Sequence, residues 1–157
     1  MARSGYTISS QTDVALVAAT AKVVMGIRGG ASFGLDLTGW SVSFDGIVAG
    51  AEPVTVELLR CTFATNPPGT NSTDIAANAA QSYGRTIPHG ITAGSNWTAA
   101  PTVLTVIDEI LIHPQAGVIY QMPLGTSPDS NENAGFAIRI TAPSAVNVRA
   151  TMKWEKI

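Results

Sequence analysis

The stretch GFAIRITAPSAVNVRATMKWE, residues 135–155, decides the fold that the sequence predicts. In its second half, apolar and polar residues alternate without a break from Val146 to Glu155, which is the period of a β-strand with one dry face and one wet face. Residues 136–141 alternate in the same way, and the segment Ala142–Ser144 between the two halves favours a turn. The sequence therefore predicts an antiparallel hairpin in residues 135–155.

Shorter strand patterns fill much of the remaining chain. Strands are predicted at residues 13–19, 22–27, 34–46, 53–63, 103–112 and 117–122. The apolar positions change parity at Thr38 and Gly39, which predicts a β-bulge there. They change parity again at Leu59. At that point the sequence leaves open whether a second bulge intervenes or both faces of the strand are covered.

Residues 64–102 are the least regular part of the chain, because prolines and glycines interrupt them repeatedly. One short helix is possible at residues 74–81, where alanines favour helix and Ser72, Thr73 or Asp74 could cap it. Loops of this length in a compact domain usually carry function or contact a partner.

About eight strands with at most one short helix predict an all-β protein. Two packed antiparallel sheets of the jelly-roll kind are the natural arrangement for strands of this number and spacing. An immunoglobulin-like sandwich is the alternative, but the chain lacks the paired cysteines of a true immunoglobulin domain. We expect a single jelly-roll-like domain at residues 13–157. It follows an extended arm, residues 1–12, whose Tyr6 and Ile8 could reach a neighbouring subunit.

The composition is poor in charge. Charged residues make up 13% of the chain, about half of the usual ~25%. The net charge of −2 and the scattered Lys and Arg argue against a nucleic-acid partner. No apolar segment is long enough for a membrane span, and residues 1–13 lack the apolar core of a secretion signal. Because the centres of interfaces are depleted in Lys, Glu and Asp, we expect other protein chains to cover much of the surface.

No catalytic or metal-binding pattern stands out, so the sequence predicts no cofactor, no metal and no enzymatic activity. His89 and His113 have no Cys or carboxylate at zinc-ligand spacing. Asp108 and Glu109 are adjacent in a predicted strand, so they point to opposite faces and could not share one sugar or metal. The acidic loop around Asp129 lacks the pattern of a calcium-binding EF-hand. A hydrolase would lack its acid and base pair.

The three tryptophans raise a different possibility, a carbohydrate-binding module that stacks sugars on exposed rings. Trp40 and Trp154 fall at inward positions of predicted strands, whereas Trp97 lies in a loop and is the one ring free to stack on a sugar. A single ring is a small platform, so packing of Trp97 in the core or at an interface is the favoured interpretation. Cys61, the single cysteine, cannot form a disulfide within the chain, and we expect it to be a small buried hydrophobe.

Several strand and turn segments resemble those of a known group of proteins: GWSVSFDG (39–46), AEPVTVELLR (51–60), TAAPTVLTV (98–106), HPQAGVIYQMPLG (113–125) and AIRITAPSAVNVRATMKWE (137–155). From Gly39 onward the chain resembles small tailed-bacteriophage proteins that are encoded among virion structural genes.

The resemblance implies a β-sandwich component of the virion, a capsid decoration (cement) protein on the outer surface of the head, assembled in the host cytoplasm. Its partners would be the major capsid protein and copies of itself, as a homotrimer. A tail or neck component is the alternative in the same context. We expect the residues at protein interfaces to be Tyr6, Ile8, Trp97, His113 and Tyr120.

Overall fold

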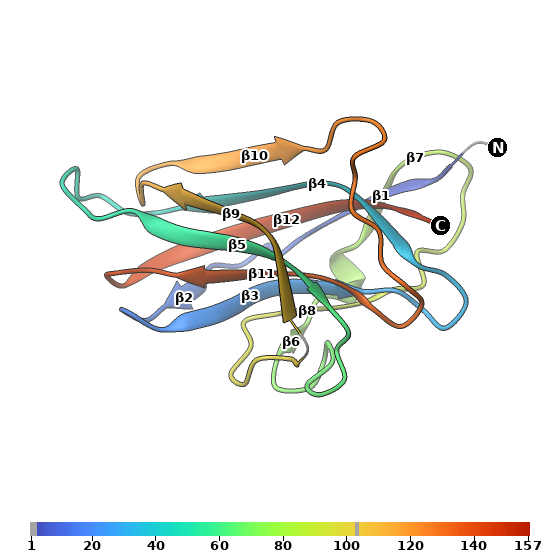
Figure 1. Cartoon of the computed structure of the whole chain (residues 1–157), viewed down its shortest axis with the longest axis horizontal. Helices are drawn as coiled ribbons and strands as arrows, with labels where there is room; N and C mark the ends of the chain where they lie inside the picture. The colour runs from blue at the N-terminus through green and yellow to red at the C-terminus, as the bar shows by residue number, and fades with distance from the viewer. Residues whose placement is uncertain (1–2, 103) are drawn as a thin grey trace.

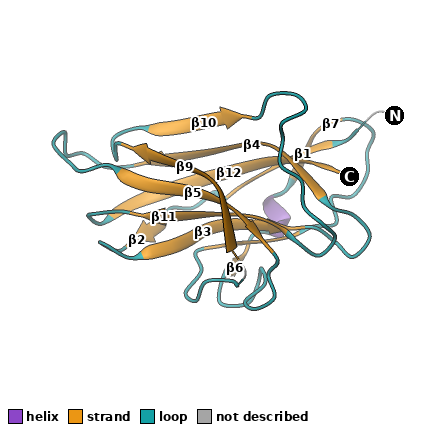
Figure 2. Ribbon diagram, viewed as in Figure 1, coloured by secondary structure: helices purple, strands orange, loops and turns teal. Residues whose placement is uncertain are grey.

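The computed structural model describes residues 3–102 and 104–157, which form two packed antiparallel sheets (Figures 1 and 2). Val103 of the predicted strand 103–112 and residues 1–2 of the expected arm lie outside the described residues. Sheet A has the order β10 (Gly117–Gln121), β4 (Leu35–Phe44), β12 (Val146–Lys156), β1 (Gly5–Ser9) and β7 (Ala80–Tyr83), with β2 (Val14–Leu16) also paired to β12. Sheet B has the order β6 (Thr73–Asp74), β8 (Thr92–Ser95), β3 (Ala21–Arg28), β11 (Gly135–Thr141), β5 (Val54–Cys61) and β9 (Leu104–Ile112).

The long strands pair in a nested order along the sequence: the strands nearest the two ends of the chain pair with each other, and each following pair lies closer to the middle of the chain. β1 and β2 pair with β12, β3 pairs with β11, β4 pairs with β10, and β5 pairs with β9. These pairs lie alternately in sheet A and sheet B, which is the arrangement of a jelly roll. The predicted all-β jelly-roll sandwich is therefore confirmed, and β6, β7 and β8 are additions from the long segment between β5 and β9.

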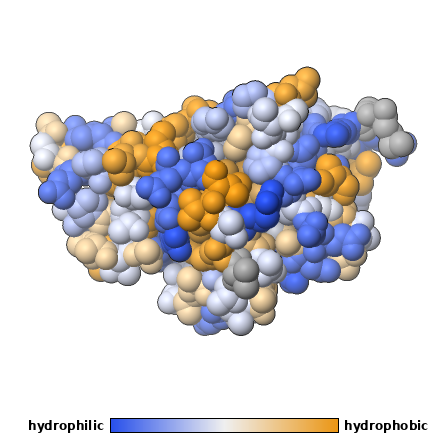
Figure 3. Space-filling view, viewed as in Figure 1, coloured by the Kyte–Doolittle hydropathy of each residue, from blue (hydrophilic) through white to orange (hydrophobic). Residues whose placement is uncertain are grey.

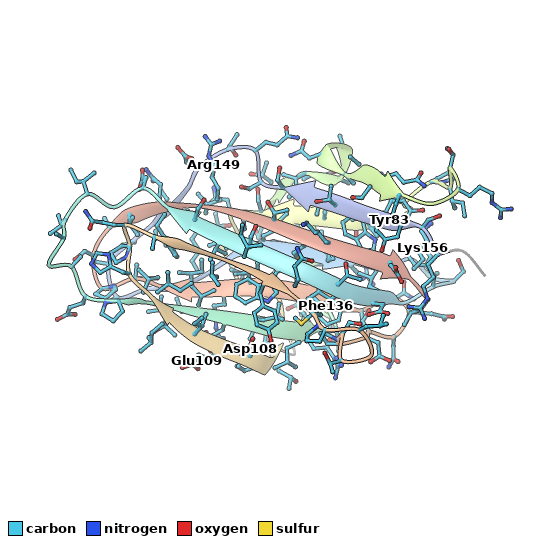
Figure 4. All side chains as sticks on the ribbon, turned by 90° about the horizontal axis from the view of Figure 1, so that it is seen from above. Tyr83, Asp108, Glu109, Phe136, Arg149 and Lys156 are labelled. Atoms are coloured by element: carbon cyan, nitrogen blue, oxygen red, sulfur yellow. The ribbon has the colours of Figure 1, made fainter. Side chains whose placement is uncertain are left out.

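The predicted hairpin of residues 135–155 is wrong. Both halves are strands, but β11 lies in sheet B between β3 and β5. β12 lies in sheet A, with β4 on one side and β1 and β2 on the other. The turn between them carries the chain across the core, with Ala142 buried. The apolar faces of β11 and β12 consequently face each other across the sandwich. Figure 4 shows Phe136 of β11 between the two layers.

Residues 5–9 are part of the sandwich and do not form an extended arm. β1 pairs with β12 on one side and with β7 on the other, so both of its edges are occupied. Its alternation places Tyr6 and Ile8 in the main core, where they are 2% and 1% exposed. The Tyr6 ring stacks on Trp154 with ring centroids 5.6 Å apart, and its hydroxyl donates a hydrogen bond to the Ile87 carbonyl. Neither side chain can contact a neighbouring subunit.

The bulge predicted in β4 is confirmed. Lys153 of β12 pairs with Gly39 and Trp154 pairs with Leu37, so Thr38 is the extra residue in β4. The bulge keeps Leu37 before it and Trp40 after it in the same core. Gly39 lies where a Cβ atom would come within 2.9 Å of the Tyr120 carbonyl oxygen, so glycine permits the close approach of β10.

The parity change at Leu59 has its cause in a second apolar layer on the outer face of sheet B. The ladder between β5 and β11 is regular through Leu59, so no bulge occurs on that side. Leu59 and Cys61 instead point outward into a buried group that we call the outer cluster, consisting of Val23, Leu59, Cys61, Phe63, Trp97 and Ala137. Both faces of β5 are therefore covered at this end, and Cys61 is buried as expected.

Trp97 closes the outer cluster and is not free to bind a sugar or a partner. It is 3% exposed, stacks on Phe63 with centroids 6.4 Å apart, and donates its indole N–H to the Asn66 carbonyl at 3.0 Å. Long-range contacts thus bury a ring that the sequence places in a loop.

The short helix considered for residues 74–81 is reduced to one 3₁₀ turn, η1 (Ala76–Asn78). Ile75 is the N-cap residue and makes no side-chain cap bond, but Asp74 just before it accepts a hydrogen bond from the Ala76 N–H at 2.9 Å. On either side the backbone pairs instead with β8 and β1. Because eight residues are too few for a stable isolated helix, strand pairing decides the outcome.

The reactivity of the Cys61 thiol measures how tightly the outer cluster is closed. Burial raises the pKa of its thiol to about 11, and we expect it to react with a disulfide reagent much more slowly than a free thiol, since thiolate and access are both needed. Trp97→Phe, which removes the bond to Asn66, should speed the labelling severalfold, and Val17→Ala, far from the cluster, should not. Rapid labelling of the native wild type would contradict the closed cluster.

An ion pair on sheet B gives a stability that depends on pH. Arg139 donates to both carboxylate oxygens of Glu57, at 2.6 and 2.8 Å, and these bonds hold the pKa of Glu57 below its usual 4.5. Glu57→Gln should lower the free energy of unfolding at pH 7 by about 1–3 kcal/mol. The difference in stability between the wild type and Glu57→Gln should shrink as the pH falls below about 4.5, because Glu57 of the wild type then becomes protonated and, like glutamine, carries no charge. Urea denaturation of both proteins at pH 7 and pH 3 measures this difference in the free energy of unfolding.

Asp13→Asn is the matched control. Asp13 pairs with Arg149, but the two side chains are 51% and 60% exposed, so solvent screens the pair and its loss should cost less than about 1 kcal/mol. An equal loss in both variants would contradict the special role of the Glu57 pair.

Candidate protein interface

Four connections between the sheets meet at one end of the sandwich, on the left of Figure 1. They join β2 to β3, β4 to β5, β9 to β10, and β11 to β12. We call this surface the loop end and define it as residues 17–20, 45–53, 113–116 and 142–145. The nested strand pairing brings together these four segments, which are far apart in the sequence.

The loop end exposes large apolar side chains. Ile47 is 88% exposed, Val17 64% and Val48 61%. Next to Ile47 and Val48 lies a mostly apolar groove of about 180 Å³, whose lining includes Pro114, Pro143 and Val146. Exposed apolar groups of this kind, grouped on one surface, are typical of sites that bind other proteins.

The β4–β5 connection that carries Ile47 and Val48 is braced by its neighbours. The His113 ring accepts a hydrogen bond at Nδ1 from the Gln115 N–H, so its Nε2–H can donate to the Ala49 carbonyl, 3.1 Å away. The Gly46 N–H donates to the Pro114 carbonyl at 2.9 Å. His113, expected at an interface, therefore lies at the loop end, where it positions the exposed residues.

A second brace ties the β4–β5 connection to β12. Asp45 accepts hydrogen bonds from the side chain and the backbone N–H of Asn147, at 2.7 and 2.8 Å, and these bonds lower the pKa of Asp45. Asp45 and Glu52 are the acidic residues of the loop end, and its four segments contain no Lys or Arg. The surface is thus apolar with a weak negative charge, which suits a partner surface that is apolar and neutral or basic.

A second apolar surface follows β9 and β10, which are neighbouring edge strands of the two sheets. Figure 3 shows hydrophobic side chains gathered along them. Ile119 is 77% exposed, Leu111 63% and Val106 45%. Tyr120, another expected interface residue, is 39% exposed and stacks on Trp40 with centroids 6.2 Å apart. We call this surface the open edge.

The adjacent carboxylates of β9 do not form a joint site. Asp108 pairs across the ladder with the buried Leu58, and Glu109 pairs with Glu57 on the other face. Asp108 accepts a hydrogen bond from the Glu109 N–H at 2.9 Å. Within the part of the chain that the structure describes, no three His, Cys, Asp or Glu side chains gather where they could hold a metal ion.

The densest group of titratable side chains lies on the other side of the molecule from Asp108 and Glu109 (Figure 4). Arg3 bridges Asp36 and Glu155, with both N···O distances 2.9 Å, and Tyr83 donates to Glu155 at 2.5 Å. Burial and the neighbouring Glu155 raise the pKa of Tyr83 to about 12. Burial raises the pKa of Glu155, but the bonds from Tyr83 and Arg3 outweigh it and lower that pKa overall. The charges pair with one another, although Asp36 Oδ1 is buried without a hydrogen-bond partner, and the group ties β4, β7 and β12 to the segment that leads into β1.

Of the five residues expected at interfaces, the structure exposes only Tyr120 substantially and places the half-buried His113 at the loop end, whereas Tyr6, Ile8 and Trp97 are buried. Sequence reasoning missed Val17, Ile47 and Val48. A signal was present in the segment GIVAGA, residues 46–51, where Ile47 and Val48 lie between glycines outside any strand pattern.

Comparisons of the chain with protein-family models, with curated proteins and with solved structures find no match. No helix within residues 3–102 and 104–157 has the length and apolar character needed to cross a membrane.

His113→Ala tests the bracing of the loop end. Without the bond to Ala49, the β4–β5 connection should open more often, and backbone amides in residues 46–52 should exchange hydrogen several times faster. The loss of global stability should stay near 1 kcal/mol. Hydrogen–deuterium exchange measured by mass spectrometry reads this directly. His89→Ala serves as the control, and an equal effect of both variants, or of neither, would contradict the bracing role.

Proposed function

We propose that this protein is a non-enzymatic structural component of a tailed-bacteriophage virion, a decoration protein that binds the outer surface of the head. The loop end is the observation that carries the proposal: an apolar, Lys- and Arg-free surface held on a rigid jelly-roll scaffold. The low overall charge and the resemblance of residues 39–155 to phage virion proteins support the same function.

The major capsid protein is the proposed partner. Burying Val17, Ile47 and Val48 against an apolar patch would supply the favourable free energy. The braces at His113 and Asp45 lower the entropy that binding must cost, since the β4–β5 connection is already ordered. Specific interfaces bury about 1,200–2,000 Å² in total. Each copy can bury less area than this and bind the shell weakly, since many copies on one shell strengthen it together. A small docking surface on each copy is therefore sufficient.

Two alternatives differ from this proposal in measurable ways. A tail or neck component would use the same kind of surface, but it would be present in about a dozen copies per particle where a head decoration protein has hundreds. A carbohydrate-binding module loses its main support, because Trp97 is buried in the outer cluster. Copy number in purified virions, measured by quantitative mass spectrometry, separates head from tail.

The proposal is tested by mixing the purified protein with undecorated heads, then measuring co-sedimentation and survival of the heads on heating. We expect binding and a gain in survival. Ile47→Asp combined with Val48→Asp should weaken binding about tenfold or more, because charge would be buried against an apolar partner. Ile157→Asp, which changes an exposed residue outside the loop end, should bind like the wild type. No binding by the wild type would remove the proposal.

A further inference from the structure

Within the described residues, five strands of the two sheets have a free edge, and four of these are poor templates for a further strand. β6 has only two residues, and β2, which pairs with β12 alone, has only three. The ladder of β7 with β1 shifts register at Gly5. β9 has a bulge at Ile107, followed by Asp108, an inward-facing charge at the edge. Short strands, bulges and inward charges are the devices by which natural sheets keep their edges from pairing.

β10 has none of these devices. Its five residues, GVIYQ, include no charge and no proline, and its ladder with β4 runs without a register shift. The uncharged run extends on both sides, from Pro114 to Pro128. Ile119 at the middle of the strand is 77% exposed, and Leu124 just beyond it is fully exposed.

The hydrogen bonds to β4 show which backbone groups of β10 are free. The Phe44 N–H donates to the Ala116 carbonyl, and the Met122 N–H donates to the Thr38 carbonyl. Because bonding alternates along a strand, residues 116, 118, 120 and 122 bond toward β4. Gly117, Ile119 and Gln121 therefore direct their N–H and C=O groups to the outer edge.

We propose that β10 pairs with β10 of a second copy of this chain, antiparallel and centred on Ile119, so that the two A sheets become one continuous sheet. In this register Ile119 lies opposite Ile119 of the second copy as a hydrogen-bonded pair, and Gly117 lies opposite Gln121. Every free N–H and C=O of the edge then gains a partner.

A second copy suits this edge better than an unrelated strand for two reasons. The spacing of Gly117, Ile119 and Gln121 is symmetric about its centre, so one surface complements itself under a two-fold axis. No charged residue lies in the segment that pairs, so the two-fold relation brings no like charges together. The pairing also covers Ile119, the most exposed apolar side chain of the open edge, and so removes apolar surface from water.

A two-fold contact closes after two copies, so it predicts a dimer in place of the homotrimer expected from the sequence. The dimer contact does not require a phage head, so it can form in the purified protein. Its test is therefore independent of the test of head binding.

Light scattering after size exclusion tests the dimer. The wild type should have about twice the chain mass of 16.2 kDa. Ile119→Lys should be monomeric at concentrations where the wild type is dimeric, because a lysine on each copy would place like charges side by side. Ile47→Lys, at the even more exposed Ile47 of the loop end, should leave the dimer intact. A monomeric or trimeric wild type, or a dimeric Ile119→Lys, would overturn the proposal.

A cross-linking variant checks the register even if the lysine variant does not fold. In Ile119→Cys, the two introduced cysteines should have Cα atoms about 5.5 Å apart, within the range that a disulfide spans. Mild oxidation should give a covalent dimer in high yield, while the buried Cys61 stays reduced. Val17→Cys, also well exposed, should give little. Equal yields from both variants, or none from Ile119→Cys, would refute the pairing.

Discussion

The structure depends on the double pairing of β12. This strand bonds with β4 along one edge and with β1 and β2 along the other, while its apolar face, with Met152 and Trp154 fully buried, packs into the main core. Because β12 comes last and β1 first, the central ladder of sheet A can close only when the whole chain is in place. The resulting contacts are mostly between residues far apart in the sequence, which is typical of slowly folding β-sandwiches.

The sequence was sufficient for most of the long strands but not for their partners, and it did not predict β1, β6, β7 or β8. Alternation with period two identifies β4, β11 and β12, and the parity change at Thr38 identifies the bulge, because both are local properties. The same alternation is produced whether neighbouring strands pair or face each other, so residues 135–155 could not reveal that they cross between the sheets. Burial of Trp97 depends on Phe63 and Asn66, more than thirty residues away. Only the fold brings them together.

The surface, too, is predicted by the sequence in part and determined by the fold in part. The shortage of charge is visible in the composition, but its concentration into two apolar surfaces is a product of topology. Val17, Ile47 and Pro114 are remote in sequence and come to the same end of the sandwich because the jelly roll brings alternate connections there, and Ile47 and Pro114 line one groove. The open edge has a different origin: β10 and β9 are both edge strands, yet only β9 has a bulge and an inward carboxylate. The two strands therefore present very different edges to an approaching chain.

The pairing of β1 with β12 has a practical result for engineering. Gly5 lies opposite Glu155, so the first and last strands leave the sandwich together, at the end away from the loop end (Figure 1). A tag, fluorophore or antigen fused to either terminus would project from that far end. Such fusions should leave both the loop end and β10 unobstructed, which makes the scaffold suitable for carrying foreign peptides.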